Sequence, residues 1–134
     1  MFGWAQDIDA AIDEVRRWTD SLPGDFTIEV TDYDDGVVVD VNGALISSGL
    51  VVRARLHLDP ALVVHQYRFH VQHSDGRLLW RHDRHAGHEN APGMHGAEHV
   101  HRLRAGREVR LPTDPVDLAG IREALVRANL EHAT

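Results

Sequence analysis

The 134-residue sequence contains no cysteine, and this absence excludes disulfide bonds and thiolate metal ligands. It also contains no lysine, so all fourteen basic residues are arginines. No apolar run approaches the roughly 20 residues that a membrane-spanning helix needs. The acidic N-terminal segment lacks the basic start and apolar middle of a signal peptide. From these absences we expect a cytoplasmic protein that has no membrane partner.

Negative charge predominates overall, since the net charge at pH 7 is -7 with histidine neutral. Such a protein is a poor candidate for broad, unspecific nucleic-acid binding, which depends on cationic surface. The charges are uneven, however. Residues 1–48 hold eleven acidic side chains and two arginines, whereas residues 49–110 hold ten arginines, ten histidines and six acidic side chains. The composition is therefore compatible with a local basic site on an acidic protein.

The length and the hydrophobic fraction of 43% fit one domain, residues 1–134, with a modest core. Apolar residues at spacings of three and four predict a helix over residues 4–22. A second helix is predicted to run to about residue 132. Asp114 suits its N-cap, Pro115 its first turn, and Asp117 supports the same start.

Between the two helices, alternating segments bounded by turn residues predict strands. These segments are 26–30, 37–41, 44–58 (one strand, or two broken near Gly49), 62–73, 77–83, 99–103 and 108–112. Asn42-Gly43 is typical of a tight turn, and residues 84–98 are expected to form a loop. We therefore expect an α+β fold. It would have an antiparallel sheet of about five to seven strands, with an N-terminal and a C-terminal helix packed on one face.

The hairpin over residues 62–83 predicts which side chains share a face of the sheet. With Asp75-Gly76 as a two-residue turn, paired residue numbers sum to 151, so His70 faces Arg81 and Arg68 faces Asp83. In this register Leu79 also lies on that face. Alternation within 50–58 adds three basic side chains if this strand lies beside the hairpin: Arg53, Arg55 and His57.

A face composed mainly of arginine and histidine suits an anion such as phosphate, because guanidinium groups bind phosphate oxygens in a bidentate manner. A solvated face of an antiparallel sheet without any ligand would also be polar, and both interpretations stand. The opposite face of the hairpin is expected to receive the helices. It carries Tyr67, Phe69, Leu78 and Trp80, with His82 among them as the histidine best suited to a structural role.

Six of the eleven histidines fall within residues 80–101, "WRHDRHAGHENAPGMHGAEHVH". Their spacing suits a transition metal such as zinc, bound by imidazole. The ligand set would be His85, His88, His95, His99 and His101. A second interpretation is that the same stretch is a polar loop without a function, because short histidine spacings arise easily at this histidine content.

Acid–base chemistry is a third interpretation of the histidines, which titrate near neutral pH. Cleavage of RNA without a metal needs one group to activate a ribose 2′-hydroxyl and another to protonate the leaving 5′-oxygen. Cationic groups must also stabilise the charged phosphorane. A set of His and Asp side chains beside arginines supplies all three requirements.

The order of residues across 62–101 resembles the TumE-type toxins of prokaryotic toxin–antitoxin pairs. Tyr67, His70 and Gln72 match the YxYHxQ strand of that family, and residues 81–83 stand at its RYD segment. Residues 85–88 fall at its APHH segment. Pro92, His95 and His99 approximate its PHHKH segment, after which the family has a C-terminal helix. The Tyr and Asn of RYDNA and the Lys of PHHKH are absent here, and the histidines near residue 95 are more widely spaced.

The resemblance implies a toxin that acts on RNA and is neutralised by a separately encoded antitoxin protein. We therefore predict a ribonuclease that uses neither a metal nor another cofactor. Its predicted acid–base residues are His70, Asp83, His85 and His99, and its predicted phosphate-binding residues are Arg55, Arg68 and Arg81. An open sheet face is also compatible with a homodimer.

Two alternatives from other classes remain. In the first alternative, the chain is a non-catalytic module that binds a metal or a small anion through the histidine-rich loop 85–101. Otherwise it is a partner-binding protein whose acidic helix 4–22 is the docking surface.

Overall fold

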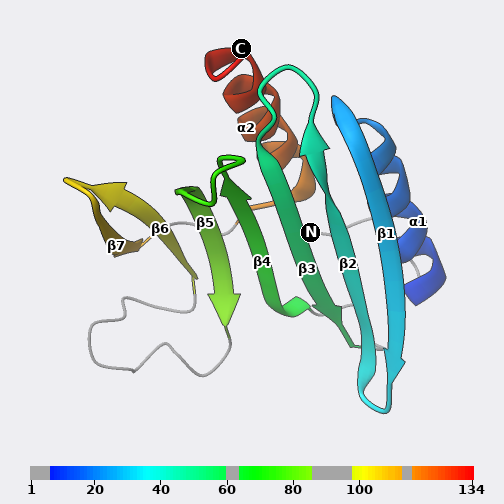
Figure 1. The fold of residues 1–134 in the computed structure, drawn as a ribbon. Coiled ribbons are helices and arrows are strands. Elements are labelled where there is room, and N and C mark those ends of the chain that lie inside the picture. Colours follow the sequence, from blue (N-terminus) through cyan, green and yellow to red (C-terminus); the bar gives the residue numbers. More distant parts are fainter. Residues whose placement is uncertain (1–6, 60–63, 86–97, 113–115) are drawn as a thin grey trace.

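Seven strands and two helices make up the described part of the chain, which comprises residues 7–59, 64–85, 98–112 and 116–134 of a computed structural model (Figure 1). The elements are α1 (Ile8–Asp20), β1 (Gly24–Tyr33), β2 (Gly36–Leu45), β3 (Val51–Leu58), β4 (Val64–Gln72), β5 (Leu78–His85), β6 (Glu98–Arg104), β7 (Arg107–Pro112) and α2 (Leu118–Glu131). Each strand pairs antiparallel with the next, in the sheet order β1 to β7. The predicted α+β fold is confirmed.

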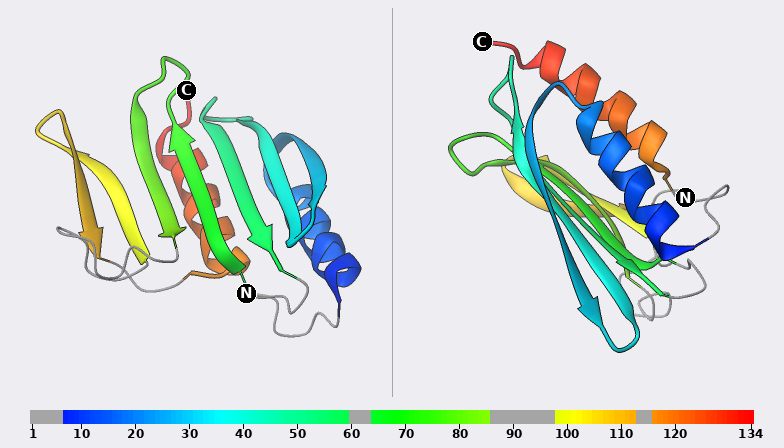
Figure 2. Two further views of the ribbon diagram at one scale, coloured as in Figure 1. Left: turned by 90° about the horizontal axis from the view of Figure 1, so that it is seen from below. Right: turned by 90° about the vertical axis from the view of Figure 1, so that its right-hand side faces the viewer.

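Both helices lie on the same side of the sheet (Figure 2), and alternation along the strands explains why. On β3, Val52 and Leu56 are fully buried while Arg53 and Arg55 between them are exposed. The buried side chains of β2, β3 and β4 pack against apolar residues of α1 and α2 in a single core. Full burial of one aliphatic side chain contributes about 1.5–3 kcal/mol, so the apolar face determines where the helices dock.

Trp18 connects both helices to the sheet. Its indole Nε1 donates a hydrogen bond of 2.7 Å to the carbonyl oxygen of Leu118, the first residue of α2. Its ring meets the ring of Phe69 on β4 edge-on, with centroids 6.0 Å apart. One buried side chain of α1 therefore fixes the start of α2 and contacts the middle of the sheet. Neither helix in the described ranges is long and apolar enough to cross a membrane.

Each helix begins at an aspartate whose carboxylate accepts a backbone hydrogen bond. Asp7 accepts from the amide of Ala10 at 2.8 Å, and Asp117 accepts from the amide of Gly120 at 2.7 Å. The prediction that Asp114 is the N-cap of the second helix is wrong, because α2 starts at Leu118, directly after Asp117. Asp114 itself and Pro115 lie outside the described residues, as do residues 4–6 of the predicted first helix.

The predicted tight turn at Asn42-Gly43 is also wrong. Both residues lie inside β2, where Gly43 pairs with Phe26 of β1. A Cβ atom at position 43 would collide with the Phe26 ring and the Asp25 carbonyl, so glycine serves a close approach of the strands. The chain turns instead at residues 46–49, where Gly49 has a φ of 71°. The predicted segment 44–58 is thus broken near Gly49.

The register predicted for the β4–β5 hairpin is confirmed, since His70 pairs with Arg81 and Arg68 with Asp83. Its two-residue turn is not, because the amide of His73 donates to the Arg77 carbonyl at 2.8 Å across a three-residue loop. A bulge at Leu79 in β5 absorbs the difference of one residue. As a result Leu79 packs against the core, on the side opposite to the one predicted.

Substitution of Asp117 tests whether this residue is the N-cap of α2. Replacing Asp117 by Ala removes the acceptor of the Gly120 amide and is expected to lower the free energy of unfolding by about 1 kcal/mol. Asp117→Asn keeps a side-chain oxygen and is expected to stay near the parent value. Urea unfolding followed by circular dichroism measures both variants, and an unchanged midpoint for Asp117→Ala would contradict this start.

Candidate functional site

The sheet face opposite the helices carries two rows of mainly polar residues that run across the strands. By backbone register the first row is Asn42, Arg53, His70, Arg81 and His101, on β2 to β6. The second row is Asp40, Arg55, Arg68, Asp83 and His99, on the same five strands. We call the surface formed by these two rows the polar face. Because neighbouring strands lie about 4.8 Å apart, adjacent side chains along a row are within interaction distance.

A shallow groove of about 340 Å³ lies in the polar face. It is lined by residues of both rows and by one alanine: Asp40, Asn42, Arg53, Ala54, Arg55, Arg68, His70 and Arg81. Four of these residues are arginines and one is an aspartate, so the lining is cationic on a protein whose net charge is -7. This local excess of guanidinium groups makes the groove a candidate site for an anion.

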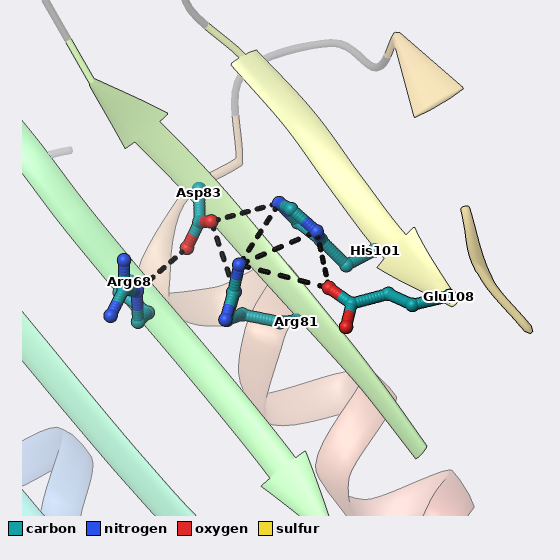
Figure 3. Close-up of polar contacts among 5 residues, drawn as sticks. All are labelled: Arg68, Arg81, Asp83, His101 and Glu108. Carbon is teal, nitrogen blue, oxygen red and sulfur yellow. Dashed lines mark hydrogen bonds and ion pairs between the residues drawn. The ribbon is translucent and has the colours of Figure 1, made fainter. Parts of the chain in front are cut away.

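The carboxylate of Asp83 is the centre of a polar cluster beside the groove (Figure 3). One of its oxygens accepts from Nε of Arg68 at 3.1 Å, and the other accepts from Nε of Arg81 at 3.0 Å. The second oxygen also lies 3.1 Å from Nε2 of His101. Only 8% of the Asp83 side chain is exposed. This carboxylate is therefore placed to orient two arginines that line the groove.

His101 is the most deeply buried member of the cluster, with 1% of its side chain exposed. Its Nδ1 lies 2.8 Å from a carboxylate oxygen of Glu108 on β7. Burial lowers the pKa of His101 and the nearby Arg81 charge lowers it further, whereas the Glu108 hydrogen bond and the charges of Asp83 and Glu108 raise it. The net direction is down, so His101 loses its proton more readily than an ordinary histidine.

His70 presents a different arrangement, because it is half-buried and lines the groove itself. Its Nε2 is 2.9 Å from the amide oxygen of Gln72, two residues along β4. An amide oxygen only accepts hydrogen bonds, so this contact assigns the proton to Nε2 in the neutral ring. The lone pair of Nδ1 is then available to accept a proton. In the register His70 stands between Arg53 and Arg81.

The arginines of the groove differ in how much of their hydrogen-bonding capacity is already used. Arg55 pairs with Asp40 at 3.1 Å, and Arg81 contacts both Asp83 and His101. Arg68 uses its Nε on Asp83 while much of its side chain is exposed. Within the ranges that the structure describes, Arg53 makes no ion pair. Arg53 and the terminal nitrogens of Arg68 are therefore the donors best placed for a ligand.

Most of the predicted site lies together on the polar face, including His70, Asp83, Arg55, Arg68 and Arg81. His85 and His99 lie in β5 and β6, where they pair by register with Gln66 and Asp83. Their side chains, like all of His88 and His95, lie outside the described residues.

Two residues of the Asp83 cluster were not assigned to it from the sequence. His101 was considered only as a metal ligand, and Glu108 was not singled out. A two-residue turn at Ala105-Gly106 would have indicated both, because it pairs Leu103 with Glu108 and places Glu108 diagonally opposite His101.

The predicted metal site stays a prediction. Among the side chains that the structure describes, no group of three or more His, Asp or Glu residues is arranged to hold a metal ion. Of the five predicted ligands, only His101 has a described side chain, and its two ring nitrogens face Asp83 and Glu108.

Comparison of the chain with protein-family models, with curated proteins and with solved structures found no match. The resemblance to the TumE-type toxins thus rests on the sequence segments quoted above.

The contacts of Asp83 predict that replacing it lowers the free energy of unfolding much more than replacing Asp40, the other aspartate of the second row. Asp83→Asn leaves Arg68 and Arg81 without their buried counter-charge and is expected to lower the free energy of unfolding by about 3 kcal/mol. Asp40→Asn removes one ion pair to the exposed Arg55 and is expected to cost less than about 1 kcal/mol. Urea unfolding compares the two variants, and equal losses would contradict the special position of Asp83.

The lowered pKa of His101 predicts how stability depends on pH. In the unfolded state the His101 imidazole has its ordinary pKa of 6.5, whereas its pKa in the folded state is lower. Near pH 6.5 the unfolded state therefore binds more protons than the folded state. The contribution of His101 to stability is therefore complete above pH 6.5 and is lost as the pH falls through the folded-state pKa. Unfolding free energies measured from pH 7.5 to 5 should decrease with falling pH, and His101→Gln should make that dependence shallower. An identical pH dependence in parent and variant would be inconsistent with the shift.

Proposed function

We propose that the chain is a metal-independent ribonuclease, and a toxin of a toxin–antitoxin pair, whose polar face binds the phosphates of RNA. The observation that supports RNA binding best is the groove in which four arginines and His70 meet on an otherwise acidic protein. The choice of a toxin rests on the sequence resemblance. It also implies an antitoxin protein, encoded separately, as the binding partner.

Phosphate binding is assigned to Arg53 and Arg68, with Arg81 beside them. Planar guanidinium groups donate two parallel hydrogen bonds to phosphate oxygens, and their charge remains at any physiological pH. Asp83 restrains Arg68 and Arg81 before a ligand arrives, so less side-chain entropy is lost on binding. This restraint is a positioning role, which differs from the acid–base role predicted for Asp83 from the sequence.

The proposed reaction begins at His70. Its Nδ1 takes the proton of a ribose 2′-hydroxyl, and the 2′-oxygen attacks the adjacent phosphorus. The arginines stabilise the negative charge of the phosphorane. The bond from phosphorus to the 5′-oxygen then breaks, and that oxygen receives a proton from a second histidine. His85 and His99 remain the sequence-based candidates for this donor. The products are a 2′,3′-cyclic phosphate and a 5′-hydroxyl.

A non-catalytic anion-binding module is the second candidate, and a specific observation favours it. His70 is the one histidine among the described residues that line the groove, while Asp83 and His101 are buried in the polar cluster beside it. A groove of this kind binds a polyanion whether or not a proton donor completes the reaction.

Cleavage of RNA in the presence of a metal chelator distinguishes the two candidates. The parent protein should produce fragments with 2′,3′-cyclic phosphate ends, and His70→Ala should cleave at least about 100-fold more slowly. His73→Ala is the matched control, since His73 lies at the β4–β5 loop in contact with His132 of the C-terminal segment. RNA affinity should remain within a few-fold of the parent in both variants.

Three outcomes would count against this mechanism. Undiminished cleavage by His70→Ala would remove His70 from the reaction. A requirement for added metal would exclude the metal-free route. RNA binding without cleavage by the parent would favour the non-catalytic module. The assignment as a toxin is tested separately, since expression of the parent but not of His70→Ala should arrest bacterial growth.

A further inference from the structure

Tyr33 and His57 form an exposed aromatic pair at one end of the polar face. Their ring centroids lie 6.4 Å apart with an angle of 43° between the ring planes. Tyr33 is the last residue of β1, and 52% of its area is exposed. Few other large apolar side chains among the described residues are exposed. Tyr33 contributes nothing to the core, so its position needs another explanation.

The pair borders the groove described above. His57 stands two residues beyond Arg55 on β3, on the same side of the sheet, about 6.6 Å farther along the strand. Glu29 of β1 pairs with Asp40 and therefore lies on the polar face. Tyr33 is four residues farther along β1, and because side chains alternate along a strand, it lies on the same side as Glu29. An aromatic surface therefore follows directly after the arginine side chains.

Charge distinguishes the two ends of this surface. Asp35, at the turn between β1 and β2, has a carboxylate oxygen 3.7 Å from Nε2 of His57 and is largely exposed. Asp34 precedes it in the same turn. These carboxylates repel phosphate at the aromatic end, whereas Arg53 and Arg68 attract it at the other end. A neutral, planar ring suits the aromatic end better than an anion does.

We propose that Tyr33 and His57 bind a nucleobase of single-stranded RNA by stacking, while the phosphates of the same strand occupy the arginine groove. Stacking on an aromatic side chain accepts any base, because each base has a π face. The inference deepens the proposed function and rests on it for the phosphate positions. It adds that the ligand is single-stranded, since the bases of a duplex are stacked on one another.

The test uses two oligomers of six nucleotides with 2′-O-methyl sugars, which lack the 2′-hydroxyl that the proposed reaction needs. One carries bases and the other is abasic at every position. Fluorescence anisotropy measures their affinity for the full chain. Tyr33→Ala should weaken binding of the oligomer with bases about tenfold. Its affinity for the abasic oligomer should stay within twofold of the parent value.

Two further variants control this measurement. Tyr33→Phe keeps the ring and should bind the oligomer with bases like the parent. Ile46→Ala removes another exposed apolar side chain, at the turn that follows β2, and should change neither affinity.

The outcomes separate this inference from the proposed function. Equal affinity of the parent for both oligomers would overturn base stacking while leaving phosphate binding in place. An equal loss for both oligomers in Tyr33→Ala would show that Tyr33 merely supports the fold, and would also overturn it. If the parent bound neither oligomer, the proposed RNA function would fail and the base site would fail with it.

Discussion

The buried carboxylate of Asp83 joins the basic side chains of three strands, Arg68 on β4, Arg81 on β5 and His101 on β6. Arg68 and Arg81, two of the arginines that line the groove, are held in position by this contact. Without a counter-charge, the neighbouring guanidinium groups of Arg68 and Arg81 in the two rows would repel one another. With it, the guanidinium groups are restrained at the edge of the groove, and their outward nitrogens remain available.

The same cluster helps to attach the β6–β7 hairpin. The described core draws on β1 to β5 and both helices, and the hairpin contributes no residue to it. Figure 1 shows β6 and β7 beyond the part of the sheet that the helices cover. The hairpin is therefore attached to β5 by backbone pairing, by the contacts of His101 with Asp83 and Arg81, and by the contact of Glu108 with Arg81. Structural attachment and the orientation of the arginines thus depend on one carboxylate.

Much of the fold was predictable because alternation of side chains is a local property of the chain. The pattern of β3 separates Val52 and Leu56 from Arg53 and Arg55 without reference to any other strand. Turns were less predictable, because they depend on neighbours. The sequence around Gly43 is typical of a turn, and only the structure shows that this glycine makes room for the Phe26 ring on the neighbouring strand. The pairing of His70 with Arg81 was right only because a bulge compensated for the wrong loop length.

The site was predictable in its components and less so in their roles. Alternation placed Arg68, His70, Arg81 and Asp83 on one face, as the structure has them. It did not indicate that Asp83 is buried, because burial of a polar-face residue depends on side chains from β6 and β7. The contribution of His101 comes from the same long-range pairing, which the sequence shows only after the intervening turn is recognised.

The salt dependence of RNA affinity tests most directly whether the polar face binds a phosphate backbone. The logarithm of the binding constant for a non-cleavable single strand, plotted against the logarithm of salt concentration, has a slope of about -0.7 for each phosphate contact. Arg53→Ala and Arg68→Ala should each make the slope shallower by about 0.7. Arg122→Ala, on the helix side of the molecule beside Ser21, should leave it unchanged. Identical slopes for all three variants and the parent would contradict phosphate binding by the polar face.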